Sequence, residues 1–505
     1  MRNIGILMRV ILILSFLSFL LLSRFSPPTE KTVKQNLAEN MSSNLPPYHI
    51  VWYHINAPQK DTNLVLKEVN KYLKEKINAT LEIRLIDWQY YDREIDAIIA
   101  SGEPYDICFT AAYKNNYAQN AANGSFIELD LLLKEHGQGI LKILNPLFLE
   151  GARIKGKIYA VPANKEIAHQ NAVIFNKKYV EKYGFDLSKI SSFYDIEPML
   201  EVIKEREPGI MPYAIQSAYN NSPSLPFDSI IENIPGALYY DNRTGYKVIN
   251  QFDTPEYKKY FSTMRRWYLA GYIPKEAASL KQLVEFEKSG SWFASVLSNV
   301  PHSDITLKLR FGYDVDVVPL MTPVIENRDC QGSMLAISKT SKNPERAMMF
   351  LDLLNTDKYL YNLIVFGIEG KHRIMKSENV FELPEGINQH NSSYMLAPFT
   401  VGNMFICYIH SSYPSTYWDD YLRFNESAVK SPLFGFSFDP APVKKEISAL
   451  LSVSSEYWGP LVTGAVDPDD YLPKAISKYK SLGLDRVMAE EQRQLDAWLA
   501  LKNKE

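Results

Sequence analysis

The segment from residue 110 to residue 117, TAAYKNNY, concentrates side chains that suit the binding of a polyhydroxylated solute. Tyr113 and Tyr117 offer aromatic faces, on which the apolar C–H face of such a solute can stack. Asn115 and Asn116 offer planar amides that both donate and accept hydrogen bonds, as hydroxyl groups require. These residue types support binding and supply no nucleophile. Both tyrosines fit equally well as padding of the loop against its own sheet.

This loop follows a short strand within an alternation of strands and helices. YHIVWYHI from Tyr48, TLEIRLID from Thr80 and YDICF from Tyr105 are typical of strands. Between the first two, Asp61 or Thr62 can cap a helix. The apolar stripe of that helix comprises Leu66, Val69, Leu73 and Ile77. The alternation predicts a mainly parallel α/β sheet, which binds ligands at the carboxyl ends of its strands.

The ends of the first two strands add residues of the same kinds. They are His54, Asn56, Lys60, Trp88, Tyr90 and Tyr91. Because the loops at one edge of a parallel sheet lie side by side, we expect these residues near the TAAYKNNY loop. Trp88, at a strand end, also fits a place in the core.

Motifs of the commonest hydrolases, zinc proteases and nucleotide-binding proteins are absent from the sequence. GxSxG, HExxH, GxxxxGK[ST] and GxGxxG do not occur. A glycosidase needs two carboxylates about 5 to 9.5 Å apart in a cleft, and the many acidic residues leave such a pair open. Cys108, Cys330 and Cys407 allow at most one disulfide and have no zinc-site spacing. We therefore expect no catalytic residues, no metal and no cofactor.

The length and the charge of the chain argue against a single-domain protein and against a nucleic-acid-binding protein. At 505 residues the chain is too long to fold around a single hydrophobic core, and two or three domains of about 100 to 200 residues each are expected. The formal net charge is −3, and no block of like charges occurs. A nucleic-acid partner is therefore not expected, because phosphate neutralisation requires clustered lysine and arginine.

The first 26 residues have the pattern of a secretion signal peptide or an N-terminal anchor. Arg2 and Arg9 precede an unbroken run of apolar residues and serines over residues 10–22. This run is shorter than the about 20 residues of a spanning helix, and no clear cleavage site follows it. Residues 27–47 lack apolar periodicity and fit a flexible tether. The bulk of the chain is expected to be extracellular, with the N-terminal segment cleaved or retained as an anchor.

The order of the later segments, together with those above, resembles the family 1 extracellular solute-binding proteins of ABC importers. The segments are SGEPYDICFT, KIYAVP, NAVIFNKKYV, the strand ending in SNVP, YDVDVVPL and SMLAISKTSKNPERAMMFLDLLNTDKYLYNLIVFGIEG. The likeness runs from residue 48 to 500 and is greatest to the long Gram-positive members with added C-terminal helices. Those members usually carry a lipidated cysteine after the signal. Here no cysteine precedes Cys108, so lipid anchoring is not expected.

The resemblance implies a periplasmic-binding-protein-like α/β fold, with two lobes, hinge crossovers, an interlobe ligand cleft and extra C-terminal helices. By analogy, residues 48–162 and 322–366 form lobe 1, and residues 163–321 and 367–505 form lobe 2 with the helical C-terminal region. Closure on a small-molecule solute, an oligosaccharide or related polyol, would present it to the permease subunits of an ABC importer. The resemblance further implies a monomer, with membrane contact through the N-terminal segment or the permease.

The resemblance also extends the candidate ligand site. Asn164, Lys165 and Glu166 follow the KIYAVP segment, where family members often place an acidic ligand contact. The remaining candidates by analogy are Ser298, Asn299, Phe436, Phe438 and Asp439. Lys165 and Glu166 also fit a solvated ion pair worth well under about 1 kcal/mol. Two other functions stay open: a membrane-anchored extracellular ligand sensor and, with less support, a glycan-active enzyme.

Overall fold

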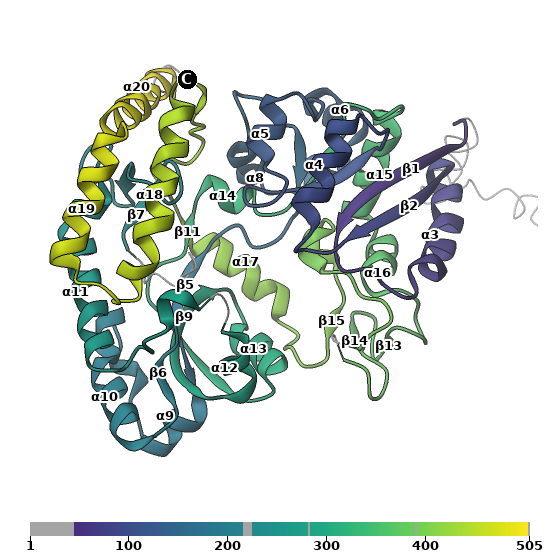
Figure 1. Cartoon of the computed structure of the whole chain (residues 1–505). Helices are drawn as coiled ribbons and strands as arrows, with labels where there is room; N and C mark the ends of the chain where they lie inside the picture. The colour runs from purple at the N-terminus through teal and green to yellow at the C-terminus, as the bar shows by residue number, and fades with distance from the viewer. Residues whose placement is uncertain (1–44, 216–224, 281–282, 389–390, 503–505) are drawn as a thin grey trace, which may run out of the picture.

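The computed structural model describes residues 45–215, 225–280, 283–388 and 391–502. These residues form two lobes that lie side by side, with a layer of long helices along one of them (Figure 1). The signal or anchor expected at residues 1–26, and the tether up to residue 44, lie outside the described residues. No helix in the described part of the chain has the length and apolar character needed to cross a membrane.

Lobe 1 is built on a five-stranded sheet with the order β2-β1-β3-β12-β4. Its strands are β1 (Tyr48–Ile55), β2 (Ala79–Ile86), β3 (Ile107–Thr110), β4 (Ala160–Pro162) and β12 (Met334–Ile337). β1 pairs in parallel with β2 and β3, whereas β12 runs antiparallel to β3 and β4. The predicted succession of three parallel strands is confirmed, so the loops after β1, β2 and β3 leave the same edge of the sheet.

The first helix of lobe 1, α3 (Thr62–Ile77), forms where the apolar stripe predicted it. All four residues of the stripe are buried against the sheet. Asp61 makes no side-chain cap. Its carboxylate instead accepts a hydrogen bond from the Ser393 hydroxyl at 2.8 Å and lies 3.1 Å from Nε2 of His372. The start of α3 is therefore fixed by a segment far along the chain, which local sequence does not reveal.

The other helices of lobe 1 surround this sheet (Figure 1). They are α4 (Tyr91–Ser101), α5 (Tyr117–Ala122), α6 (Asp130–His136), α7 (Gln138–Ile143), α8 (Pro146–Ala152), α15 (Pro344–Thr356) and α16 (Lys358–Phe366). Two further helices, α14 (Asn327–Cys330) and α17 (Tyr417–Ser427), lie between the lobes in the same view.

Lobe 2 is built on a four-stranded sheet with the order β10-β5-β9-β6. Its strands are β5 (Gln170–Asn176), β6 (Met211–Tyr213), β9 (Trp292–Asn299) and β10 (Val315–Pro319). One face is covered by α9 (Lys177–Tyr183), α10 (Glu197–Arg206) and α11 (Pro255–Leu269). The other face is covered by α12 (Val284–Ser289) and α13 (Ser303–Phe311).

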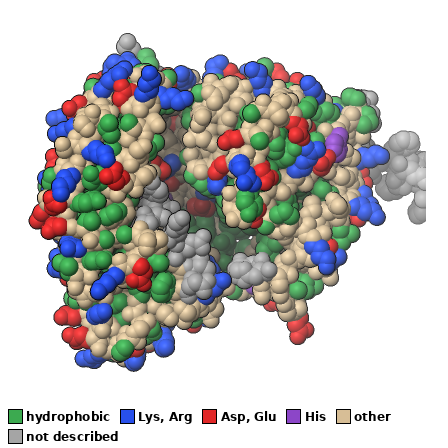
Figure 2. All heavy atoms as spheres, viewed as in Figure 1, with side chains coloured by type: hydrophobic (Ala, Val, Ile, Leu, Met, Phe, Trp, Pro, Cys, Tyr) green, Lys and Arg blue, Asp and Glu red, His purple; other side chains and the backbone are tan. Residues whose placement is uncertain are grey.

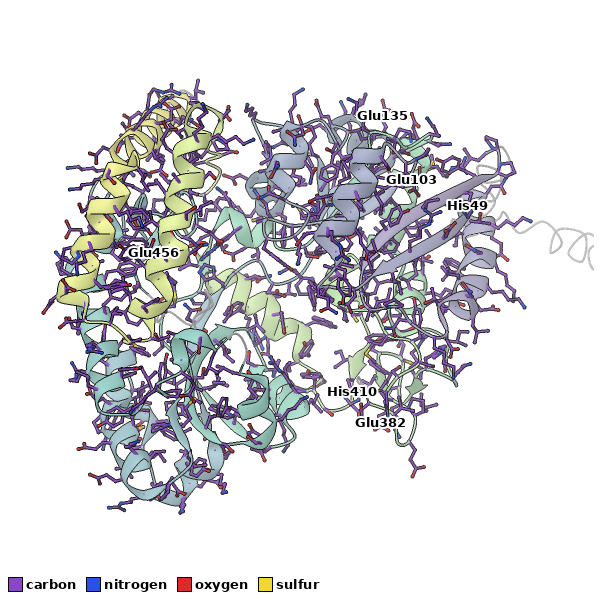
Figure 3. All side chains as sticks on the ribbon, viewed as in Figure 1. His49, Glu103, Glu135, Glu382, His410 and Glu456 are labelled. Carbon is purple, nitrogen blue, oxygen red and sulfur yellow. The ribbon has the colours of Figure 1, made fainter. Side chains whose placement is uncertain are left out.

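Three C-terminal helices, α18 (Lys444–Val462), α19 (Pro468–Ser481) and α20 (Leu484–Lys502), share the core of lobe 2. α18 and α19 pack on α11, and the layer is coloured yellow-green to yellow in Figure 1. Lys478 of α19 pairs with Glu456 of α18 at 2.5 Å, and Glu456 is labelled in Figure 3. The predicted C-terminal helices are confirmed.

Residues 367–427 pack with lobe 1, whereas the predicted division of the chain placed them in lobe 2. Phe381 and Tyr394 of this segment are buried in the core of lobe 1. A small sheet is formed by β13 (Ile374–Met375), β14 (Val380–Glu382) and β15 (Ile409–His410); Glu382 and His410 mark it in Figure 3. The elements are short and irregular, so their apolar residues show no periodicity that indicates which core they join.

Three segments cross between the lobes, at residues 163–169, 320–326 and 428–432. β11 (Val324–Ile325) pairs in parallel with β16 (Val429–Lys430). His169 forms an antiparallel bridge with Val324. The crossing segments are thus hydrogen-bonded to one another, an arrangement that suits hinge movement of two lobes about a shared axis.

Candidate functional site

A hollow lies between the two lobes at the centre of the molecule (Figure 2). The first crossing segment carries Lys165 and Glu166, whose Nζ and Oε1 atoms form an ion pair of 2.6 Å. Their side chains are 11% and 22% exposed, so this is not the solvated pair that the sequence left open. Partial burial strengthens the attraction between the charges. The pair therefore holds one cationic donor and one anionic acceptor in fixed positions where the lobes meet.

Tyr113, in the loop after β3, lies near this pair. Its side chain is 56% exposed, yet surrounding protein and the charge of Glu166 raise the pKa of its phenol. The phenol therefore lies close enough to Glu166 for the charge of that carboxylate to act on it. Tyr113 is thus the aromatic candidate of lobe 1 that the structure brings together with Glu166.

Helix α17 and the turn before it present aromatic residues that the sequence analysis did not select. The ring centroid of Tyr417 lies 4.6 Å from those of Tyr413 and Trp418, and 5.0 Å from that of Tyr421. Burial, with a smaller contribution from the charge of Glu166, raises the pKa of Tyr417 and of Tyr421. We call these four residues the α17 aromatic cluster. The signal was present as YPSTYWDDY, but the strand before it, β15, has only two residues and is too short to be predicted from the sequence.

His302 of lobe 2 reaches the α17 aromatic cluster from the loop before α13. Its Nε2 lies 2.9 Å from Oδ2 of Asp420, and its ring stacks on Tyr417 with centroids 5.2 Å apart. The hydroxyls of Thr306 and Tyr413 are 3.1 Å apart. The φ of 61° at His302 is left-handed, which is rare outside glycine. These contacts join α13 to α17 across the junction of the lobes.

The predicted Ser298 and Asn299 end β9, close to this loop. Ser298 is exposed. The Asn299 amide donates to Oε1 of Gln170 at 2.9 Å, and the Gln170 amide donates to the carbonyl of Met321 at 2.6 Å. Asn299 therefore ties β9 to the hinge, while Ser298 keeps its hydroxyl at the surface.

Two predicted residues of lobe 1 lie in its interior instead of at the hollow. His54 is 0% exposed, its Nε2 lies 3.0 Å from Oγ1 of Thr400, and burial lowers its pKa to about 3. Tyr117 is also 0% exposed; its hydroxyl donates to the carbonyl of Ala152 at 2.8 Å and accepts from the N–H of Tyr159 at 3.1 Å. The buried, neutral imidazole of His54 and the phenol of Tyr117, whose hydroxyl makes two hydrogen bonds, are structural. We therefore leave both out of the proposed contact set, by which we mean the residues proposed to contact the solute.

The two asparagines of the loop shape the loop itself. Asn115 is buried at a φ of 45°. Its amide donates to the carbonyl of Phe109 at 2.8 Å, and its Oδ1 accepts from Asn120 at 2.9 Å. Asn116 caps α5 by accepting from the N–H of Gln119 at 2.9 Å. From this loop, Tyr113 alone stays in the proposed contact set.

Trp88 and Asn164 have mainly structural neighbours. Trp88 is half-buried, with ring centroids 6.2 Å from Phe109 and 6.1 Å from Phe399. It packs on the lobe 1 core, which favours the core interpretation that the sequence left open. Asn164 is buried, and its amide donates to Oδ1 of Asn403 at 3.1 Å.

The three candidates of the C-terminal third lie with the helical layer. Phe436 is buried, with its ring 5.7 Å from that of Trp498 on α20. Phe438 packs on the same layer. Asp439 pairs with Lys155 of lobe 1 at 3.0 Å, and this lysine lowers the pKa of its carboxyl. Their side chains pack on the helical layer and lobe 2 or pair with Lys155, so we leave them out of the residues proposed to contact the solute.

A network of charged residues surrounds the second crossing segment. Oε1 of Glu326 accepts from the hydroxyl of Tyr240 at 2.5 Å, and Oε2 pairs with Arg328. Arg328 also reaches Glu232 of lobe 2 at 2.8 Å. Burial and the charge of Glu326 raise the pKa of the Asp228 carboxyl well above its usual range. The network bonds lobe 2 to the start of α14.

The same network contains the histidine and carboxylates most suited to a cation. Ligand atoms of His169, Glu326 and Asp329 lie within 4.8 Å of one another. Nδ1 of His169 is 2.8 Å from Oδ2 of Asp329, and Tyr240 and Arg328 engage Glu326. These donors and acceptors satisfy each other, so the group is a hydrogen-bond network. The free thiols, all buried, are Cys108, Cys330 and Cys407.

Replacing His169 by glutamine is expected to destabilise the fold more at low pH. Burial lowers the pKa of His169, but the hydrogen bond and charge of Asp329, with the charge of Glu326, outweigh it and raise the pKa overall. Protonation therefore stabilises the folded state fully below the unfolded pKa of 6.5, and this contribution is lost as pH rises through the folded value. Urea unfolding at pH 5.5 and 8 should show a loss larger by about 1 to 2 kcal/mol at pH 5.5.

His410→Gln provides the control of opposite sign. Burial lowers the pKa of His410, so protonation opposes folding there, and the variant should gain relative stability as pH falls. A loss in His169→Gln that is equal at both pH values would contradict the ion pair with Asp329.

The sequence matches two families. Residues 56–360 match the family described as bacterial extracellular solute-binding protein, and residues 432–500 match a domain of unknown function (DUF3502). A protein of Streptococcus pneumoniae serotype 4, named carbohydrate ABC transporter substrate-binding protein, is 32% identical over 461 residues. The match covers 90% of this chain and 91% of that protein.

Solved structures show the same similarity in three dimensions. The N-glycan transport solute binding protein NgtS of Streptococcus pneumoniae has a TM-score of 0.83 at 32% identity, covering 91% of this chain and 100% of that one. Its complexes with Man1GlcNAc and Man5GlcNAc have TM-scores of 0.75 and 0.72, at 31% and 32% identity. They cover 90% and 91% of this chain and 100% of theirs. The family match covers residues 56–360, and the structure has two lobes joined by crossing segments around a hollow. This chain therefore belongs to the bacterial extracellular solute-binding protein family.

Proposed function

We propose that the chain is the receptor of an ABC importer for an oligosaccharide that contains mannose and N-acetylglucosamine. As a member of its family it is an extracellular binding protein and not an enzyme, and its partners are a small-molecule solute and permease subunits. The sugar type is supported by the similarity to a protein whose structures hold Man1GlcNAc and Man5GlcNAc. The observation in this structure that carries the proposal is the grouping of Tyr113, Glu166 and Tyr417 between the lobes.

The chemistry of this group fits a neutral saccharide. The partly exposed rings of Tyr113, Tyr417 and Trp418 offer stacking faces for the C–H side of a pyranose, and the buried Tyr421 packs behind them. Glu166 accepts hydrogen bonds from hydroxyls, and Lys165 donates to them, while their mutual pair of 2.6 Å cancels the net charge. A site with this composition favours a polyhydroxylated ligand over an ionic one.

Lobe closure is proposed as the response to the solute. The TM-score falls from 0.83 for NgtS described without a sugar to 0.75 and 0.72 for its sugar complexes. This trend supports an open arrangement of the lobes in the present structure. Closing would move α13 relative to α17, so the His302–Asp420 contact is a natural place for the rearrangement.

We also propose how the receptor is displayed. The chain acts as a monomer at the cell surface and contacts the membrane through the N-terminal segment or the permease. The apolar run at residues 10–22 supports this arrangement.

Replacing Tyr113 by alanine is expected to weaken binding of Man5GlcNAc by about 1 to 2 kcal/mol, or 5- to 30-fold in Kd. The ring is 56% exposed, so its loss removes a stacking face and leaves the core intact. Isothermal titration calorimetry measures the affinity, and differential scanning calorimetry the melting temperature, which should change little.

Tyr359→Ala is the matched control, because Tyr359 on α16 is similarly exposed at 49%. Its Kd should equal that of the unaltered protein. Intact affinity together with a large loss of stability in Tyr113→Ala would show that this ring is a packing residue.

A further inference from the structure

A pocket on lobe 2 lies beside the interlobe hollow. It has a volume of about 540 Å³ and is bounded by α13 on one side and by the edge strand β10 on the other. Small-molecule sites in proteins commonly enclose about 300 to 1,000 Å³. Val300, Ile305 and Val317 supply an apolar part of its lining. The size and the apolar part are suited to a small organic ligand.

The charged side chains of the pocket largely neutralise one another. Lys308 pairs with Asp314 at 2.8 Å, and Lys177 pairs with Asp316 at 3.6 Å. All four residues line the pocket. Their ammonium and carboxylate groups supply donors and acceptors without a large net charge. This combination favours a neutral ligand with many hydroxyls over a phosphorylated or strongly cationic one.

The loop before α13 connects this pocket to the proposed saccharide site. His302 lines the pocket and stacks on Tyr417 of the α17 aromatic cluster at 5.2 Å. Asp304 also lines the pocket, and its charge adds to the rise in the pKa of Tyr413 that burial causes. His302 therefore contacts both the pocket and the α17 aromatic cluster, and its ring is where the two sites adjoin.

We propose that this pocket is a second saccharide subsite, which receives a branch or extension of the oligosaccharide held between the lobes. The inference rests on the proposed function and assigns to lobe 2 the selection of larger glycans over the disaccharide core. The apolar residues would face the C–H surface of a sugar ring, and the paired lysine and aspartate groups its hydroxyls.

Ile305→Trp tests the subsite by filling it, with Leu309→Trp as the matched control. Ile305 lines the pocket, whereas Leu309 lies on the same helix with its side chain 46% exposed and is outside the lining. The probes are Man1GlcNAc and Man5GlcNAc, titrated by calorimetry into the purified protein. Ile305→Trp should weaken Man5GlcNAc binding about tenfold and leave Man1GlcNAc within about twofold, because the added ring collides only with the extension. Leu309→Trp should leave both affinities unchanged.

A second variant, Lys308→Ala, tests the same subsite in case Ile305→Trp does not fold. The Lys308 side chain is 57% exposed, so Lys308→Ala removes a donor from the pocket without disturbing a core. It should give the same selective loss for Man5GlcNAc, at about three- to fivefold. Unchanged affinities in both folded variants, or equal losses for the two glycans, would overturn the subsite. Failure of the unaltered protein to bind either glycan would instead overturn the proposed function on which the subsite rests.

Discussion

Gly464→Ala is expected to lower the free energy of unfolding by about 3 kcal/mol. Gly464 lies between α18 and α19 at a φ of 71°, and a Cβ there would stand 2.1 Å from the carbonyl oxygen of Met264 on α11. The left-handed backbone costs about 1 to 2 kcal/mol for alanine, and overpacking against a rigid backbone about 1 to 3 kcal/mol. The turn has no room to relax, because Arg265 donates to the carbonyls of Gly464 and Ala465 at 3.1 and 3.2 Å.

Gly184→Ala separates the two costs. Gly184 follows α9 at a φ of 62°, and a Cβ there would meet no heavy atom within 4 Å. Only the backbone cost of about 1 to 2 kcal/mol applies. Urea unfolding followed by circular dichroism compares the two variants with the unaltered protein. Equal losses would show that the C-terminal helices do not depend on the close approach of this turn to α11.

Replacing Glu491 by methionine is expected to stabilise the protein by about 1 to 3 kcal/mol at pH 7. Glu491 is 0% exposed on α20, between the fully buried Val487 and Leu495. Within the described residues neither oxygen of its carboxyl has a hydrogen-bond partner. The carboxyl also lies so close to Gly236 that a Cβ there would stand 2.1 Å from Oε2. An apolar side chain of similar length fills the same space without the penalty for the unpaired polar group.

The gain should depend on pH. Burial raises the pKa of Glu491 well above its usual 4.5. The folded state therefore retains a proton that the unfolded state releases, so the stability of the unaltered protein falls as pH rises from about 4.5 towards the folded value. The methionine variant lacks this dependence, and its advantage should grow from pH 4.5 upwards in urea unfolding.

Glu490→Met is the neighbouring control for this prediction. Arg493 and Gln494 lower the pKa of the partly buried Glu490 carboxyl, so its removal should give no gain at neutral pH. An advantage of Glu491→Met that is flat from pH 4.5 to 8 would mean that its carboxyl does not titrate as a buried acid.

The local sequence was sufficient to predict the main strands and helices, and it supplied part of the proposed site. The strands and the apolar stripe of α3 were predicted from the spacing of apolar residues along the chain. That spacing follows from the backbone geometry of a few neighbouring residues, so local sequence is enough to predict it. The same local rule placed Tyr113 beyond β3, at a sheet edge where ligands bind. Lys165 and Glu166 came from the resemblance, and the structure places both where the lobes meet.

Other features were decided only by contacts between distant segments. His54 follows the same strand-end pattern as Tyr113, but Thr400, 346 residues later, covers it and makes it a core residue. Residues 367–427 join lobe 1, and they bring the α17 aromatic cluster to Glu166. The burial of a side chain depends on every segment that packs over it. The spacing of apolar residues indicates only on which face of its strand or helix the side chain lies. The sequence by itself therefore determined the strands and helices of this chain and the residue types proposed for binding, and tertiary packing decided which of the candidate side chains stay at the surface between the lobes and which are buried.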